Sequence, residues 1–272
     1  MVCFPNAKIN LGLNVLDKRP DGFHNLHTVF YPIHINDILE TIPVENAIQP
    51  IQFSHTGLAI DGDEANNLCV KAYHLIKNIR PKLPPIQMHL HKNIPMGAGL
   101  GGGSADGAFA LKQLNDQFDL QIPSDELLQL ALELGSDCPF FILNQPCLAT
   151  GRGEILAPIN LNLSAYAIAI VNPGIHVHTG WAFSQLTYKN PSTLLSDAIK
   201  LPVHQWKNHI ENDFESAVCA THPEIEAIKT SLYNAGSIYA AMSGSGSTVF
   251  GIFDAQVDLS AYFPSTYFCK WV

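Results

Sequence analysis

A glycine-rich segment at residues 95–106 constrains this chain more than any other feature. Five glycines fall within the seven residues from 97 to 103, directly before a helical pattern. Glycine allows positive φ angles and a close approach of the backbone to a ligand, and a helix N-terminus adds unpaired N–H groups and the positive end of the helix dipole. Five glycines cost conformational entropy that a plain turn does not require, so the segment predicts a phosphate-binding loop.

A strand precedes this loop and a helix follows it. Apolar and polar residues alternate over residues 86–91, with the two-residue period of a strand that has one buried face. After the loop, Ala108, Leu111, Leu114 and Phe118 recur at helical spacing. The local order is therefore strand, glycine loop, helix.

Two well-known glycine loops fit this segment less well. No lysine follows the glycines, which excludes a Walker-type loop. Gly97, Gly99 and Gly102 satisfy the dinucleotide-binding pattern G-x-G-x-x-G. That pattern normally opens its domain and is followed by an acidic residue at the end of the next strand, whereas Asp116 and Asp119 lie at a helix end. A nicotinamide-dependent oxidoreductase stays an alternative, and it would bind NAD rather than ATP.

Composition sets the class of protein. The chain has 272 residues, 47% of them apolar and 14% charged, which indicates a globular protein long enough for two domains. A net charge of −9 argues against nucleic-acid or anionic-membrane partners. Six cysteines without C-x-x-C spacing predict reduced thiols. Neither a membrane-spanning run nor an export signal is present, so we expect a cytoplasmic protein, whose oligomeric state the sequence does not indicate.

The N-terminal region is predicted to form β-strands that carry polar side chains. Apolar residues alternate from Ile9 to Val15, which predicts a strand that turns at residues 18–22 and pairs with a second strand. If the apolar side chains face the core, Lys8 and Asn10 share the opposite face. A basic side chain and an amide therefore project together from one strand.

Helix signals follow further along the chain. A helix is expected after Asn67, and Ser124 is expected to cap a helix that Gly135 ends. A domain boundary is expected near Pro158, before a new strand. The second domain should contain a helix from residue 223 to about 234 and two strands joined by a glycine-rich turn at 243–247.

Asp137 is a candidate catalytic carboxylate. It stands between Gly135 and Pro139 in an otherwise apolar neighbourhood. Aspartate is also favoured at helix N-caps and turns, so a purely structural role is an equal alternative from the sequence alone.

Three of these segments together resemble the GHMP kinases. They are the glycine loop at 95–105, the N-terminal segment at 5–11 and the turn region at 242–250. Within that superfamily the resemblance is closest to the kinases of 4-diphosphocytidyl-2-C-methyl-D-erythritol. The further matching segments are 19–24, 135–139, 151–154, 172–174 and 212–215.

The resemblance implies a fold and a reaction. The fold would be α+β, with an N-terminal β-rich α/β nucleotide-binding domain over residues 1–158 and a C-terminal ferredoxin-like α/β substrate domain over residues 159–272. The reaction would be ATP- and Mg²⁺-dependent phosphorylation of a hydroxyl on a cytidine diphosphate ester, in the non-mevalonate isoprenoid pathway. A kinase of the mevalonate or homoserine type, and a noncatalytic nucleotide-binding protein, are the remaining alternatives.

The resemblance also implies roles for individual residues. Asp137 would be the general base, and Lys8 would orient the attacking hydroxyl. Phe23 replaces a commoner tyrosine, which keeps the stacking face and loses a hydroxyl contact. The implied ATP-binding residues are Pro95, Met96, Gly97, Ala98, Gly99, Leu100, Gly101, Gly102, Gly103, Ser104, Ala105, Asn67 and Lys92, with Ser104 also a candidate Mg²⁺ contact. The implied substrate-binding residues are Asn10, Phe23, His24, Thr179 and Phe183, with cytosine between Phe23 and Phe183.

Overall fold

The chain forms two compact units that are interleaved along the sequence. The computed structural model describes residues 1–45, 47–60, 62–186, 188 and 193–272. The first unit comprises residues 1–7, 34–96 and 101–145, and the second comprises residues 8–33, 97–100 and 146–272. The sequence suggested a single boundary after residue 158, whereas contacts group residues 8–33 with the C-terminal part of the chain. The assignment of nucleotide and substrate binding to the two expected domains stays a prediction.

The first unit contains a mixed four-stranded sheet. Its strands, in spatial order, are β1 (Val2–Cys3), β4 (Ile38–Pro43), β6 (Ile86–Lys92) and β5 (Ile51–Gly57). The β5–β6 pair is parallel and the other two pairs are antiparallel. This mixture differs from the all-parallel sheet typical of a dinucleotide-binding domain.

Strand β6 confirms the alternation read from the sequence. Ile86, Met88 and Leu90 are each 1% exposed, while the residues between them are more exposed. The same two-residue period places Lys92 on the buried face, where it is 0% exposed. A charged side chain inside the unit requires charged partners.

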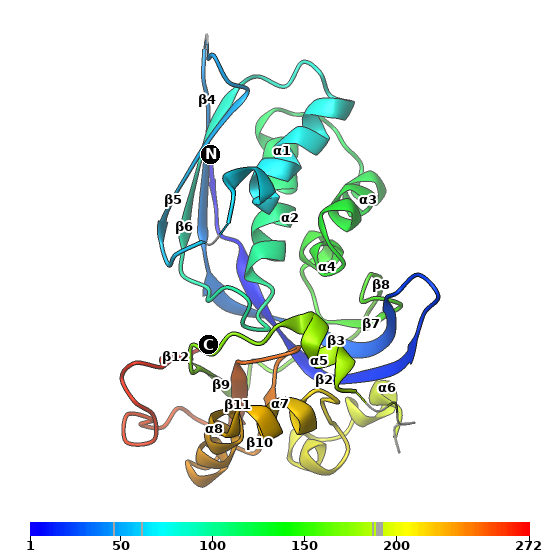
Figure 1. Cartoon of the computed structure of the whole chain (residues 1–272), viewed down its shortest axis with the longest axis vertical. Helices are drawn as coiled ribbons and strands as arrows, with labels where there is room; N and C mark the ends of the chain where they lie inside the picture. The colour runs from blue at the N-terminus through cyan, green and yellow to red at the C-terminus, as the bar shows by residue number, and fades with distance from the viewer. Residues whose placement is uncertain (46, 61, 187, 189–192) are drawn as a thin grey trace. The chain divides into compact units, whose positions relative to one another are not determined.

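Helices cover one face of this sheet. In Figure 1, α1 and α2 lie against the sheet, and α3 and α4 lie on the far side of α2. Gly107 permits the close approach of α1 to α2, because a Cβ there would lie 2.8 Å from the Leu68 Cβ. The helical elements of this unit are η1 (Glu64–Asn66), α1 (Leu68–Ile79), α2 (Gly102–Gln117), α3 (Ser124–Leu134) and α4 (Cys138–Leu143).

The helix α3 begins one residue earlier than the sequence predicted. Ser124 is its first helical residue, so the prediction that Ser124 caps the helix is wrong, and Pro123 occupies the N-cap position. Pro123 has φ −69° and ψ 159°, the extended conformation that an N-cap needs, because its ring fixes φ near that value. Gly135 ends the helix as expected.

Most of a second sheet belongs to the second unit. Its strands, in spatial order, are β2 (Asn6–Lys18), β3 (His24–Asn36), β7 (Cys147–Thr150) and β8 (Ile155–Pro158). The sequence predicted one buried face for β2, but residues 6–15 are buried on both faces. The polar face is therefore inside the protein, where its groups must find hydrogen-bond partners.

The third sheet is antiparallel and lies entirely in the second unit. Its strands, in spatial order, are β10 (Tyr239–Met242), β11 (Val249–Phe253), β9 (Ala167–Asn172) and β12 (Phe268–Trp271). Helix α8 packs on β10 and β11 (Figure 1) and matches the predicted range. The helical elements of this unit are α5 (Thr179–Ser184), α6 (Leu195–Ala198), η2 (Val203–Asn208), α7 (Glu215–Thr221) and α8 (Pro223–Asn234).

Cysteine and hydropathy expectations can be compared with the structure. All six cysteines are free thiols. Within the part of the chain that the structure describes, no helix combines the length and the apolarity needed to cross a bilayer.

Candidate active site

In the glycine loop before α2, every second residue from 97 to 101 is a glycine with a left-handed backbone conformation. Gly97, Gly99 and Gly101 have φ angles of 61°, 78° and 70°. Gly101 is the N-cap of α2, so the first turn of the helix has no side chain over its amide groups. These N–H groups have no acceptor within the helix and can bind an anion. The predicted strand, loop and helix are confirmed, while the contact with phosphate stays a prediction.

Packing also requires two of these glycines. A Cβ on Gly99 would lie 2.0 Å from the Ser243 carbonyl oxygen. A Cβ on Gly102 would lie 2.9 Å from Ile94 Cγ2 and 3.0 Å from Lys92 Nζ. The glycine content of the loop therefore has a structural cause besides any approach to a ligand.

In the second unit, Lys8 contacts the glycine loop. Its side chain is buried, and its Nζ donates to Asn10 Oδ1 at 2.5 Å and to the Gly99 carbonyl at 3.2 Å. The Nζ also lies 5.0 Å from the centre of the Phe30 ring. The prediction that Lys8 and Asn10 share one face of their strand is confirmed, and Lys8 is not a solvated surface lysine.

The turn at 243–247 meets the same loop carbonyl. Ser243 Oγ donates to the Gly99 carbonyl at 2.8 Å and accepts the Asn10 N–H at 3.1 Å. Asn10 Nδ2 donates to Thr28 Oγ1 at 2.9 Å. Three segments far apart in sequence therefore converge within the second unit. Both side-chain groups of Asn10 have protein partners, and its predicted contact with substrate stays a prediction.

In the first unit, Asp137 lies beside the start of α2. It occupies the N-cap position of α4, yet among the described residues its side chain makes no capping hydrogen bond. The next residue, Cys138, is buried and hydrogen-bonds with Ser104. Burial raises the pKa of the Cys138 thiol to about 12, and the Ser104 hydrogen bond acts in the opposite direction. Asp137 thus adjoins a residue that contacts the first turn of α2, and its carboxylate makes no helix-capping hydrogen bond.

The far end of α4 is tied to the N-terminal segment. Asn144, the C-cap of α4, donates from Nδ2 to Asn6 Oδ1 at 2.9 Å within the first unit. Asn6 stands two residues before Lys8 in the chain. The C-terminal end of α4 is therefore tied to the start of β2 within the first unit.

Comparison with known proteins identifies the family. Residues 67–145 match the model of the GHMP kinase N-terminal domain, and residues 200–265 match that of the GHMP kinase C-terminal domain. A 4-diphosphocytidyl-2-C-methyl-D-erythritol kinase of Parabacteroides distasonis is 50% identical over 93% of this chain and 92% of its own length. The chain belongs to this kinase family. A relative of the same name from Bacteroides fragilis is 48% identical over 99% of this chain and 98% of its own length.

A solved structure agrees with this membership. The crystal structure of a 4-(cytidine 5'-diphospho)-2C-methyl-D-erythritol kinase matches with a TM-score of 0.80 and 31% identity, over 93% of this chain and 90% of that chain. The expected α+β GHMP kinase fold is confirmed. The protein is an ATP-dependent small-molecule kinase, as family membership shows.

The predicted substrate-binding rings of this kinase are paired with other side chains. His24 stacks on Phe183 with ring centres 4.3 Å apart and planes inclined by 14°. The Arg152 guanidinium lies over the Phe23 ring at 4.4 Å, and His24 Nε2 lies 3.1 Å from the Tyr188 hydroxyl. His24 therefore covers one face of Phe183, and the binding of a cytosine between Phe23 and Phe183 stays a prediction.

His24 and Thr179 offer polar groups near these rings. Burial, aided by the charge of Lys18, lowers the pKa of His24. This shift favours the neutral imidazole, which presents one hydrogen-bond donor and one acceptor. Thr179 Oγ1 lies 3.1 Å from Ser245 Oγ and so links α5 to the turn at 243–247.

Lys92 lies inside the first unit in a cluster with two aspartates. Its Nζ donates to Asp37 Oδ2 and, at 2.6 Å, to Asp106 Oδ2. Asp37 Oδ1 accepts the N–H groups of Asn93 and Ile94 at 2.6 Å and 2.9 Å. The cluster thus joins the end of β6 to the second turn of α2, on either side of the glycine loop. The predicted contact of Lys92 with ATP stays a prediction.

The charges of this cluster are mutually dependent. Burial alone would lower the pKa of Lys92, but the charges of Asp106 and Asp37 outweigh it and raise that pKa. Burial and the negative charge of Asp37 raise the pKa of Asp106 well above its usual range, against the opposing effect of Lys92. The lysine is therefore held as a cation by its partners.

Asn67 has a structural contact in addition to its predicted one. It is the N-cap of α1, and its Oδ1 accepts the Cys69 N–H at 2.9 Å. The expectation of a helix after Asn67 is confirmed, and its contact with ATP stays a prediction.

Three further residues contact the candidate site residues, although no sequence pattern marked them individually. They are Ser243, Arg152 and Tyr188. Ser243 was visible only as part of a glycine-rich turn, and Arg152 only as part of the 151–154 segment. No local pattern marks Tyr188, because its contact with His24 spans 164 positions in the sequence.

Proposed function

We propose that this chain transfers the γ-phosphoryl group of ATP to the 2-hydroxyl of 4-diphosphocytidyl-2-C-methyl-D-erythritol, giving the 2-phosphate and ADP in the non-mevalonate isoprenoid pathway. The observation that carries the proposal lies in the second unit, where Lys8 and Ser243 both contact the Gly99 carbonyl of the glycine loop. In the first unit, Asp137 adjoins Cys138, which hydrogen-bonds with Ser104 near the start of α2. The identity of 50% to a kinase of that name supports the choice of substrate.

The backbone of the loop would bind the phosphates of ATP. Phosphoryl transfer asks a protein mainly for positioning and for stabilisation of charge on the moving group. The amides of the first turn of α2 supply fixed donors for that charge, and Lys8 supplies a buried cation beside the loop.

Two side chains would act on the acceptor hydroxyl. Asp137 would accept its proton as the new oxygen–phosphorus bond forms and the bond from the γ-phosphorus to the bridging oxygen of ADP breaks. Lys8 would hold the hydroxyl oxygen in line and favour the ionised form of Asp137. Asn10 would orient Lys8, since it accepts a hydrogen bond from its ammonium.

The donor set near Ser104 fits a magnesium ion that is held largely by the nucleotide. Mg²⁺ commonly uses one or two protein oxygens together with substrate phosphates. Two oxygen donors in the first unit are candidates. They are the hydroxyl of Ser104, which hydrogen-bonds with Cys138, and the carboxylate of Asp137, the residue before Cys138. When bound, the ion would neutralise charge on the β- and γ-phosphates.

A phosphorus NMR assay tests the reaction. The protein is incubated with ATP, Mg²⁺ and, separately, the cytidine diphosphate ester, mevalonate and homoserine. We expect ADP and one new phosphomonoester signal only with the cytidine diphosphate ester. A new signal with another acceptor would assign a different kinase reaction, and ATP binding without any product would favour the noncatalytic alternative.

The Lys8→Met variant should lose about two to three powers of ten in kcat. That is the usual effect of removing one fixed donor from a developing negative charge. Methionine has a similar length and suits a buried position, so the fold should persist. Steady-state kinetics measures the effect, and Lys71→Met, at an exposed position on α1, is the control. A kcat within a few-fold of wild type would remove Lys8 from the reaction.

A further inference from the structure

The segment 211–215 has no role in the proposed reaction, yet it pairs with the strand that carries Lys8. The Leu13 N–H donates to the Glu211 carbonyl at 2.9 Å, and the Asp213 N–H donates to the Leu13 carbonyl at 2.9 Å. The Asp213 carboxylate also accepts the Val15 N–H at 2.7 Å. The segment therefore extends the hydrogen bonding of β2, as a short parallel bridge between Leu13 and Asn212.

The same segment also holds the end of β10. Asn212 Nδ2 donates to the carbonyls of Met242 and Gly244, both at 2.8 Å. Glu215 Oε1 accepts the Met242 N–H at 2.6 Å. Strand β10 is at the edge of its sheet, so these two side chains supply partners that a neighbouring strand would otherwise provide. They fix three backbone groups at the entrance of the 243–247 turn.

This turn carries the contact between β10 and the glycine loop. Ser243, the first residue after β10, donates to the Gly99 carbonyl. That carbonyl also accepts from Lys8. A displacement of the turn would therefore move the loop peptide and the ammonium that contacts it.

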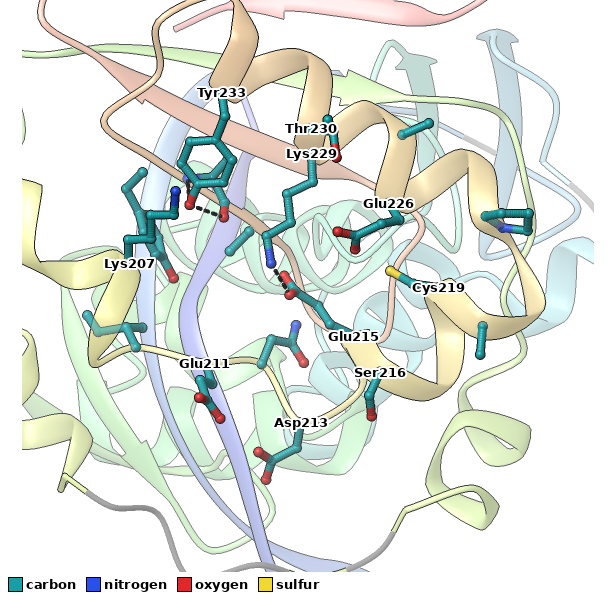
Figure 2. Close-up of a pocket in the computed structure, with 18 of the residues that line it drawn as sticks. Lys207, Glu211, Asp213, Glu215, Ser216, Cys219, Glu226, Lys229, Thr230 and Tyr233 are labelled. Atoms are coloured by element: carbon teal, nitrogen blue, oxygen red, sulfur yellow. Dashed lines mark hydrogen bonds and ion pairs between the residues drawn. The ribbon is translucent and has the colours of Figure 1, made fainter.

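A lysine holds Glu215 in place. Lys229 Nζ donates to Glu215 Oε2 at 2.5 Å, as Figure 2 shows. Burial alone would lower the pKa of Lys229, but Glu215 outweighs it and raises that pKa. The pair lies at a groove of about 1210 Å³ between α7, α8 and residues 207–213. With one carboxylate oxygen on the lysine and the other on the Met242 amide, Glu215 has a single orientation.

We propose that Glu215, oriented by Lys229, is a positioning residue for phosphoryl transfer. It sets the turn at 243–247 so that Ser243 holds the Gly99 peptide against Lys8. The proposal rests on the proposed function only for its kinetic readout. Its geometry stands on contacts within the second unit.

A double-mutant cycle tests this coupling. Glu215→Ala and Ser243→Ala should each lower kcat about tenfold, roughly the effect of losing one hydrogen bond to a well-placed group. If Glu215 acts through Ser243, the double variant should also lose about tenfold, with the KM for the acceptor nearly unchanged in all three. A loss near the product of the two single effects would overturn the proposal.

A matched control and a second readout separate positioning from simple support of the fold. Glu224→Gln alters an exposed carboxylate in the first turn of α8, the helix that carries Lys229, and it should leave kcat unchanged. Amide hydrogen exchange of residues 97–101 should accelerate equally in Glu215→Ala, Ser243→Ala and the double variant. This readout needs no substrate, so it tests the proposal even if the NMR assay rejects the proposed reaction. Unchanged exchange in Glu215→Ala would overturn it.

Two variants of similar size, each of which removes a charge, cover the case in which Glu215→Ala does not fold. Glu215→Gln keeps an acceptor for the Met242 N–H and should retain more activity than Glu215→Ala. Lys229→Met leaves Glu215 in place without its orienting partner and should raise exchange of the loop by a smaller factor. Exchange equal to wild type in both variants would contradict the proposal.

Discussion

Replacing Asp137 with asparagine is expected to lower kcat by about two to four powers of ten, the usual contribution of a general base. Asparagine has nearly the same shape but cannot accept the proton of the attacking hydroxyl. The affinity for ATP should change little, because the phosphates are assigned to backbone amides of the loop. Single-turnover phosphorylation and calorimetric titration with a nonhydrolysable ATP analogue measure the two effects separately.

The control for this variant is Asp125→Asn, an exposed aspartate in the first turn of α3. It should retain wild-type turnover. Wild-type turnover in Asp137→Asn would show that another group accepts the proton.

The Lys92→Met variant should lose about 3 to 5 kcal/mol of the free energy of unfolding. Removing one member of a buried ion pair leaves its partners as uncompensated charges in a medium that solvates them poorly. Here Asp37 and Asp106 would both lose their cation. Urea denaturation at pH 7 measures the loss. The slope of the transition is compared with that of the wild type as a check on two-state unfolding.

Lys71→Met on the exposed side of α1 is the control, and its free energy of unfolding should stay within about 0.5 kcal/mol of wild type. If Lys92 serves mainly to join β6 to α2, the folded fraction of Lys92→Met should bind ATP with an affinity close to wild type. Wild-type stability combined with a large loss of ATP affinity would instead support the direct contact with ATP that the sequence resemblance implies.

Local features of this protein were predictable from its sequence. The alternation of apolar and polar residues predicted β6. The dense run of glycines predicted a loop before α2, because few other structures need so many glycines. Helix α8 matches the predicted range because Pro223 and Gly236 mark its ends. The inward position of Lys92 was also predictable, since it continues the two-residue period of buried side chains from Ile86 to Leu90, but the resemblance assigned Lys92 a contact with ATP instead.

Long-range arrangements were not predictable in the same way. The order of strands and the interleaving of the two units depend on contacts between residues that no local pattern connects. Ser243 reaches Gly99 across 144 positions, and Glu215 reaches Met242 across 27. The edge strand β5 was missed because its alternation of apolar and polar residues extends over only Ile51 to Ser54 and its remaining residues are polar and exposed. The Ser124 cap was predicted wrongly because Pro123 already supplies the extended conformation at that position.

A crystal structure of the kinase with a nonhydrolysable ATP analogue and the cytidine diphosphate ester tests the central claim most directly. The account predicts β- and γ-phosphates bound by the first-turn amides of α2, and an acceptor hydroxyl within hydrogen-bond distance of both Lys8 Nζ and the Asp137 carboxylate. A triphosphate bound away from the glycine loop, or a hydroxyl that neither side chain can reach, would contradict it.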